Sequence, residues 1–216
     1  MLFSSQVQLD LFNNPPENKF SSLEEVKEVA LNCNRCGLRE NCTQVVFGSG
    51  DADTELMFVG EGPGGEEDKQ GIPFVGRAGR LLDRILKEAE IDREEVYISN
   101  IIKCRPPNNR KPTEEEMRTC LWILTQEIKF IDPTIIVPMG STALQGLLDP
   151  NGKITKVRGK WVEHQGKYFL PTFHPAALLR DERKKKPVWK DFLKIKKAYE
   201  KYLRLKEEGK EIESKI

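Results

Sequence analysis

Three features are missing from this 216-residue sequence. No stretch approaches the roughly 20 consecutive apolar residues that a membrane-spanning helix needs. The N-terminus lacks the basic region and apolar core of a secretory signal, so we expect a cytoplasmic protein without membrane contact. A large excess of one charge is also missing, because the formal net charge is only +1. The charged fraction is nevertheless 32%, and with few glutamines this favours a thermophilic source.

The charge is unevenly distributed along the chain. Residues 180–206 contain twelve Lys and Arg against four Asp and Glu, a local net charge of +8. Such a segment could follow a nucleic-acid phosphate backbone. It could equally be the solvated face of a helix.

The five cysteines are an odd number for a set of disulfides, and in a cytoplasmic chain they favour metal binding or redox chemistry. Cys33 and Cys36 form a C-x-x-C pair, and Cys104 and Cys120 could complete a set of four thiolates. Such a set suits Zn²⁺ or an iron–sulfur cluster. The second C-x-x-C of a zinc ribbon is missing, and the pair follows a helix rather than the strand of a thioredoxin-like motif. Cys42 is expected to be unligated.

Hydrophobic periodicity predicts strands alternating with helices in one domain, 21–206, between an N-terminal arm (1–20) and a C-terminal tail (207–216). Expected strands cover 55–59, 96–102, 134–139 and 168–173, the last after a hairpin in 152–166. Expected helices cover 22–32, 77–89, 113–130, 142–148 and 189–210. This alternation predicts a parallel, doubly wound α/β sheet.

Ligands of such sheets bind beyond the carboxyl ends of the strands. The residues expected there are Gly60, Glu61, Gly62, Asn100, Gly140, Ser141 and His174. His174 is one of two histidines, and the other, His164, is expected at the surface. A lone histidine at a strand end is more often structural, but these polar neighbours favour a catalytic interpretation.

Residues 60–65 match the G-x-G-x-x-G dinucleotide fingerprint, yet the context argues against it. Glu66, Glu67 and Asp68 follow directly and would repel a pyrophosphate. Gly71 and Pro73 prevent the immediate long helix that the fingerprint requires. The loop 60–76 is therefore expected to bring bare backbone close to a neutral ligand, with Phe74 offering an aromatic face or packing in the core.

Three segments and the cysteine spacing together resemble the family-4 uracil-DNA glycosylases, the iron–sulfur branch of that superfamily. The segments are GEGPGGEEDKQGIPFVGRAGRLLD (60–83), SNIIKCRPPNNRKPT (99–113) and FHPAALLR (173–180). The resemblance implies a three-layer fold whose central, mostly parallel four-stranded sheet is flanked by helices. It also implies a structural [4Fe–4S] cluster held by Cys33, Cys36, Cys104 and Cys120.

The implied activity is DNA repair: hydrolysis of the N-glycosidic bond of deoxyuridine in DNA, giving free uracil and an abasic site. A monomer is expected. By this resemblance Phe74 would stack on the flipped uracil, Asn100 would read its edge, and His174 would hydrogen-bond O2. The backbone of residues 60–62 would line the same pocket, and Glu67 would lie near C5, where it would exclude the methyl group of thymine.

Family-1 enzymes orient the attacking water with an aspartate where this chain has Gly62. The neighbouring Glu61 is therefore a candidate catalytic residue beside His174, with a structural role as its alternative. The resemblance further implies that Leu178 enters DNA as a wedge and that Arg180 contacts phosphate, with ordinary core packing as the alternative for Leu178. Two other functions stay open, an iron–sulfur redox protein and a nucleic-acid-binding module without catalysis.

Overall fold

The computed structural model describes residues 20–208, so the expected arm and tail lie almost entirely outside the described residues and stay predictions. The helices of this part are α1 (Leu23–Leu31), α2 (Gly65–Gln70), α3 (Arg77–Glu88), α4 (Glu114–Ile131), α5 (Ser141–Leu147), α6 (Ile154–Val157), α7 (Pro175–Arg180) and α8 (Lys185–Glu207). The strands are β1 (Ser49–Gly50), β2 (Leu56–Gly60), β3 (Tyr97–Asn100), β4 (Ile135–Pro138), β5 (Val162–His164) and β6 (Lys167–Phe169). Single 3₁₀ turns cover Arg39–Asn41, Arg93–Glu95, Pro107–Asn109 and Glu182–Lys184.

The described strands form one six-stranded sheet in the order β1-β3-β2-β4-β6-β5, not the expected four-stranded one. The four inner strands are parallel. The two additional strands, β1 and β5, pair antiparallel at the edges. They span only two and three residues, too few for a period-2 pattern to show in the sequence.

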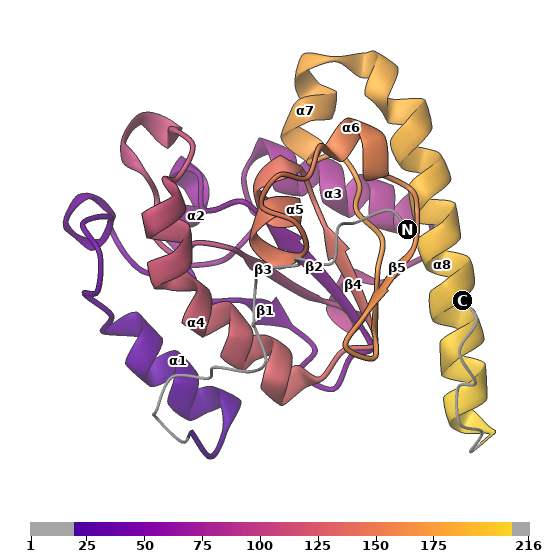
Figure 1. Cartoon of the computed structure of the whole chain (residues 1–216), viewed down its shortest axis with the longest axis horizontal. Coiled ribbons are helices and arrows are strands. Elements are labelled where there is room, and N and C mark those ends of the chain that lie inside the picture. The colour runs from indigo at the N-terminus through magenta and orange to yellow at the C-terminus, as the bar shows by residue number, and fades with distance from the viewer. Residues whose placement is uncertain (1–19, 209–216) are drawn as a thin grey trace.

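Helices cover both faces of the sheet, as expected for a three-layer fold (Figure 1). Along β2, Met57 and Val59 join a core beneath α1, α4 and α5. Leu56 and Phe58 point the other way, into a core beneath α3, α7 and α8. Successive strand residues face opposite sides, so a fully buried apolar strand serves two cores at once.

Local capping sets several helix boundaries. Thr113 and Glu116 form a capping box at the start of α4, and the Ser22 side chain caps α1. The helix α8 begins four residues before the expected start, because Pro187 falls in its first turn, where no backbone N–H is needed. The short helix α2 interrupts the expected loop 60–76 and ends at Gly71, whose φ is +73°.

The hairpin expected in 152–166 is displaced toward the C-terminus. The helix α6 takes its first half, and the antiparallel strands β5 and β6 turn at Gln165–Gly166. His164 is half-buried on β5 instead of lying free at the surface, with its ring 6.4 Å from that of Phe169. An edge strand buries one face, which explains the difference.

Candidate active site

The parallel strands end at one edge of the sheet, and their register places specific residues side by side. Gly60, the last residue of β2, is paired with Asn100, the last residue of β3. Met139 follows β4 and bridges to Thr172, two residues before His174. The expected strand-end residues therefore gather at this edge.

The backbone conformation of Phe74 places its ring beside Gly60 at this edge. Its side chain is 5% exposed, and its φ is +57°, an uncommon left-handed conformation for a bulky residue. Gly79 permits this geometry, because a β-carbon there would lie 1.8 Å from the Phe74 carbonyl oxygen. Strain of this kind costs about 1–3 kcal/mol and persists where the surroundings fix the conformation.

Phe74, Asn100 and His174 are brought together around Gly60. A β-carbon at Gly60 would lie 2.4 Å from Asn100 Oδ1 and 2.5 Å from Phe74 Cζ, so both side chains rest against this residue. The rings of Phe74 and His174 are 5.4 Å apart, with an interplanar angle of 34°. The three groups share one region.

The amide oxygen of Asn100 is the most conspicuous polar atom of the site. The residue is 2% exposed, and its Oδ1 has no hydrogen-bond partner. A buried acceptor without a partner costs about 1–3 kcal/mol. This atom is therefore prepared to accept a hydrogen bond from a ligand that enters the site.

His174 is held as a neutral imidazole with a defined tautomer. Its Nδ1 accepts a hydrogen bond from the Ala176 backbone N–H at 3.1 Å, which caps α7. Burial, with a smaller contribution from the charge of Arg180, lowers the pKa of His174 to about 4. Because Nδ1 accepts, the ring proton resides on Nε2, and this nitrogen is a hydrogen-bond donor.

The two carboxylates of the glycine loop are fixed differently. Glu61 is half-buried, and its Oε2 accepts a hydrogen bond from the Thr142 hydroxyl in α5. Glu67 is buried, and its oxygens accept the backbone N–H groups of Gly64 at 3.1 Å and Gly76 at 2.8 Å. Glu67 thus ties α2 to the start of α3, directly after Phe74.

Gly62 allows the backbone of the loop to pack closely against the Ile102 side chain. A β-carbon there would lie 2.5 Å from Ile102 Cγ1. The backbone N–H groups after β3 continue the pairing, with Ile101 donating to the Gly60 carbonyl and Ile102 to the Glu61 carbonyl. The expected loop residues therefore pack against the end of β3.

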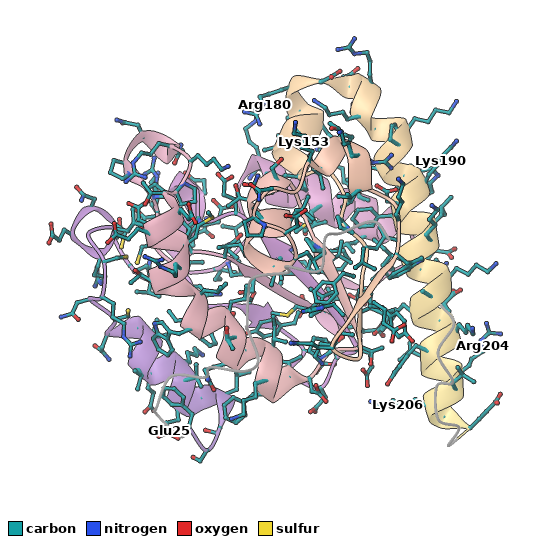
Figure 2. All side chains as sticks on the ribbon, in the orientation of Figure 1. Glu25, Lys153, Arg180, Lys190, Arg204 and Lys206 are labelled. Atoms are coloured by element: carbon teal, nitrogen blue, oxygen red, sulfur yellow. The ribbon has the colours of Figure 1, made fainter. Side chains whose placement is uncertain are left out.

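The segment after His174 requires a correction. Leu178 is 1% exposed and packs in the hydrophobic core, so it cannot enter DNA while α7 keeps this position. Leu179 is 41% exposed and precedes the exposed Arg180 (Figure 2). A short helix turns successive side chains by about 100°, so only one of two neighbouring leucines can face the core.

The four cysteines expected to bind metal line one cavity on the α1 and α4 side of the sheet. Its walls comprise Cys33, Cys36, Cys104, Cys120, Arg35, Arg39, Val45, Lys103, Thr119 and Ile123. All five cysteines are free thiols. The Cys42 side chain lies outside this lining but within hydrogen-bonding reach of Cys104.

The chemistry of this donor set fits an iron–sulfur cluster. Burial raises the pKa of the Cys104 and Cys120 thiols, and a bound cation would offset that cost by stabilising the thiolates. Within residues 20–208 no three His, Cys, Asp or Glu side chains are close enough to hold a single metal ion. Four cysteine thiolates are the ligand set that a [4Fe–4S] cluster takes, and all four cysteines line this one cavity.

Residues that the sequence interpretation missed lie between these two regions. Lys103 and Glu127 form a fully buried ion pair, with Nζ and Oε2 2.6 Å apart. Lys103 follows the apolar pair Ile101–Ile102, and this position after an apolar run was the available signal for it, whereas Glu127 follows the polar Thr125 and Gln126 in α4 and carries no such signal. Within the described part of the chain, no helix has the length and apolar character of a membrane span.

Comparisons with known proteins identify the family of this chain. The family model described as Uracil DNA glycosylase superfamily matches residues 47–195. A type-4 uracil-DNA glycosylase of Thermotoga maritima is 53% identical over 163 residues, covering 74% of this chain and 84% of that protein. Type-4 uracil-DNA glycosylases from Sulfurisphaera tokodaii and Archaeoglobus fulgidus are 43% and 41% identical to this chain. Each match covers 81% of this chain, and the two matches cover 84% and 92% of those proteins, respectively.

Proposed function

The chain belongs to the uracil DNA glycosylase superfamily, and we infer from this membership that it is a DNA-repair hydrolase. It is a uracil-DNA glycosylase, which removes uracil from DNA by hydrolysing the N-glycosidic bond of deoxyuridine. The products are free uracil and an abasic site. The residue roles below are our proposal, and the observation that carries them is the unpartnered Asn100 Oδ1 beside Phe74 and His174.

Base recognition follows from the donors and acceptors of this pocket. A uracil extruded from the duplex would stack on Phe74, a contact of about 1–3 kcal/mol. Asn100 Oδ1 would accept the N3–H of uracil while its amide N–H donates to O4. Cytosine presents the opposite pattern, which leaves both amide groups unpaired and makes its binding costly.

Bond cleavage leaves negative charge on the departing base and cation character on the sugar. The Nε2–H of His174 would donate to uracil O2 as this charge develops, like a donor of an oxyanion hole. The accepting Nδ1 and the low pKa of His174 both support a neutral ring at neutral pH. Removing one such donor typically slows catalysis by about 100- to 1,000-fold.

The two loop carboxylates would have separate roles. We assign the attacking water to Glu61, since this residue directly follows Gly60 and the Thr142 hydroxyl fixes one of its carboxylate oxygens. Glu67 would face uracil C5 and exclude the thymine methyl. Its two backbone hydrogen bonds support this role, because a held side chain cannot retreat from the methyl group.

DNA would approach the end of the molecule that carries α7. Exposed Arg180 would contact phosphate, and exposed Leu179 would take the wedge role first expected of Leu178. Lys153 and Lys190 extend from the neighbouring α6 and α8 regions (Figure 2). The proposed pocket needs no residue from a second copy of the chain, and we propose a monomer that acts in the cytoplasm.

Cys33, Cys36, Cys104 and Cys120 would hold a [4Fe–4S] cluster in their shared cavity. When bound, the cluster would supply cross-linking of the chain, not electron transfer. The cysteines come from the segment after α1, the loop after β3 and α4, so ligation would join three separate segments.

The test is cleavage of an oligonucleotide with a single uracil, followed by alkali to break the strand at abasic sites. We expect cleavage at uracil and none in matched oligonucleotides with cytosine or thymine at that position. The Asn100→Asp variant should lose uracil activity or gain activity on cytosine, because one carboxylate oxygen replaces the amide donor. Asn151→Asp, an exposed loop position, is the matched control and should behave as wild type. A wild-type protein that leaves the uracil strand intact would refute the function, and an unchanged Asn100→Asp variant would refute the recognition role.

A further inference from the structure

Lys103 lies at the junction between the cysteine cavity and the proposed base pocket. It follows the end of β3 by three residues, and its side chain is 1% exposed. An ammonium group has three N–H donors, and all three are used here. They donate to Ser99 Oγ at 2.5 Å, the Asn100 carbonyl oxygen at 2.9 Å and Glu127 Oε2 at 2.6 Å.

Glu127 is equally saturated with hydrogen bonds. Its Oε2 also accepts from Ser99 Oγ at 2.7 Å. Its Oε1 accepts from the Gly48 backbone N–H at 2.8 Å and the Tyr97 hydroxyl at 3.4 Å. The carboxylate of α4 therefore reaches β3 at two residues.

The backbone of Lys103 extends the network in the other direction. Its N–H donates to Cys120 Sγ at 3.3 Å, and its carbonyl oxygen accepts from the Val46 N–H at 2.7 Å. One residue thus contacts a cysteine of the cavity through its N–H and the Asn100 carbonyl through its Nζ.

A buried ion pair of this kind is poor evidence for a role in stability alone. Removing two charges from water costs several kcal/mol per ion, and apolar replacements of similar volume are often neutral or stabilising. The pair needs another explanation, and its contacts point to Asn100. Because Asn100 Oδ1 has no hydrogen-bond partner in the free protein, no hydrogen bond to this oxygen fixes the amide, and the backbone that carries the side chain contributes to its position.

We propose that Lys103 and Glu127 are positioning residues for base recognition. Their buried ion pair fixes the Asn100 peptide and so holds its amide ready for uracil before the base arrives. This inference rests on the proposed function of Asn100. Misplacing a recognition group by about 1 Å can slow an enzyme by about 100-fold, so we expect a loss of about 10- to 100-fold in kcat when the pair is removed.

The experiment uses the double variant Lys103→Met with Glu127→Gln, which removes both charges without leaving one buried alone. We expect this variant to show the lowered kcat. Its KM for the oligonucleotide should be nearly unchanged, because the proposed DNA contacts, Leu179 and Arg180, are not altered. The uracil-to-cytosine rate ratio should fall, and the Asn100 side-chain amide signal in NMR should shift or broaden without DNA. The substitution keeps the backbone N–H of residue 103, which donates to Cys120 Sγ, so the absorbance of the proposed cluster near 400 nm should be retained.

The matched control is Lys167→Met with Asp132→Asn, which removes an ion pair of 2.6 Å near the start of β6. It should retain the wild-type kcat, rate ratio and Asn100 signal. If the first double variant does not fold, Ser99→Ala removes only the hydroxyl shared by Lys103 and Glu127, and a smaller change in the same direction is expected. A folded variant with wild-type kcat, rate ratio and Asn100 signal would overturn the inference. An inactive wild-type protein would instead refute the proposed function.

Discussion

His174 illustrates how a few local contacts define the chemistry of a residue. Its position at the start of α7 gives Nδ1 the Ala176 N–H as donor, and burial disfavours the charged ring. The ordinary pKa of histidine is near 6.5, so the folded value of about 4 keeps the ring neutral across the physiological range. Neutral His174 donates through Nε2 only.

This shift predicts the pH dependence of both the ring and the fold. The folded protein binds fewer protons at His174 than the unfolded chain between pH 6.5 and about 4, so the contribution of His174 to stability decreases as pH falls through this window. In an NMR titration the His174 ring signals should stay constant through pH 6.5 and move only near pH 4. An inflection at pH 6.5 would contradict the assignment of a buried neutral donor.

The sequence predicted which polar residues lie near the carboxyl ends of the strands. Gly60 and His174 directly follow predicted strands and Asn100 lies near the end of another, so the predicted parallel topology places all three near one edge. Lys103 and Glu127 were missed, because their meaning depends on a contact across 24 residues between a loop and a helix. The partner of a buried charge is not visible in the sequence.

The short helix α7 determines which side chains after His174 face the core and which face solvent. It begins at Pro175 after its His174 cap, and its six residues direct Leu178 inward and Leu179 outward. The sequence AALLR does not tell which leucine faces the core, because the helical phase depends on where the helix begins. The short α2 was not expected inside the glycine loop for another reason, because its six residues GEEDKQ contain no apolar side chain and so show no hydrophobic periodicity.

The two leucines of α7 give a matched pair of variants. Leu179→Ala should preserve the melting temperature but slow uracil removal from double-stranded DNA more than from single-stranded DNA, since a wedge assists base extrusion. Leu178→Ala should lower the free energy of unfolding by about 2–5 kcal/mol through a core cavity. Thermal unfolding and strand-cleavage rates measure both effects. Equal slowing on both substrates by Leu179→Ala would contradict the wedge.

At the scale of the whole molecule, the four parallel strands and the two cores agree with the sequence pattern, since fully apolar segments such as 56–59 require cover on both faces. The edge strand β1 was missed because it spans two residues and pairs with the distant β3, and β5 because its three residues are too few for a period-2 pattern to show. Relatives named as type-4 glycosylases leave the redox-protein and non-catalytic alternatives without support.

The cysteine cavity predicts different consequences for two neighbouring cysteines. Cys104→Ala should abolish absorbance near 400 nm and lower the melting temperature, because metal ligation is coupled to folding. Cys42→Ala should retain both, since Cys42 lies outside the cavity lining despite its contact with Cys104. Absorbance spectra and thermal unfolding of the purified proteins measure this. Full colour in Cys104→Ala, or its loss in Cys42→Ala, would contradict the ligand assignment.

A crystal structure of the protein with free uracil bound would locate the base relative to Phe74, Asn100 and His174. We expect uracil to stack on Phe74, with its N3 within hydrogen-bonding distance of Asn100 Oδ1 and its O2 within hydrogen-bonding distance of His174 Nε2. A uracil bound elsewhere, or one that leaves Asn100 Oδ1 without a partner, would contradict this expectation.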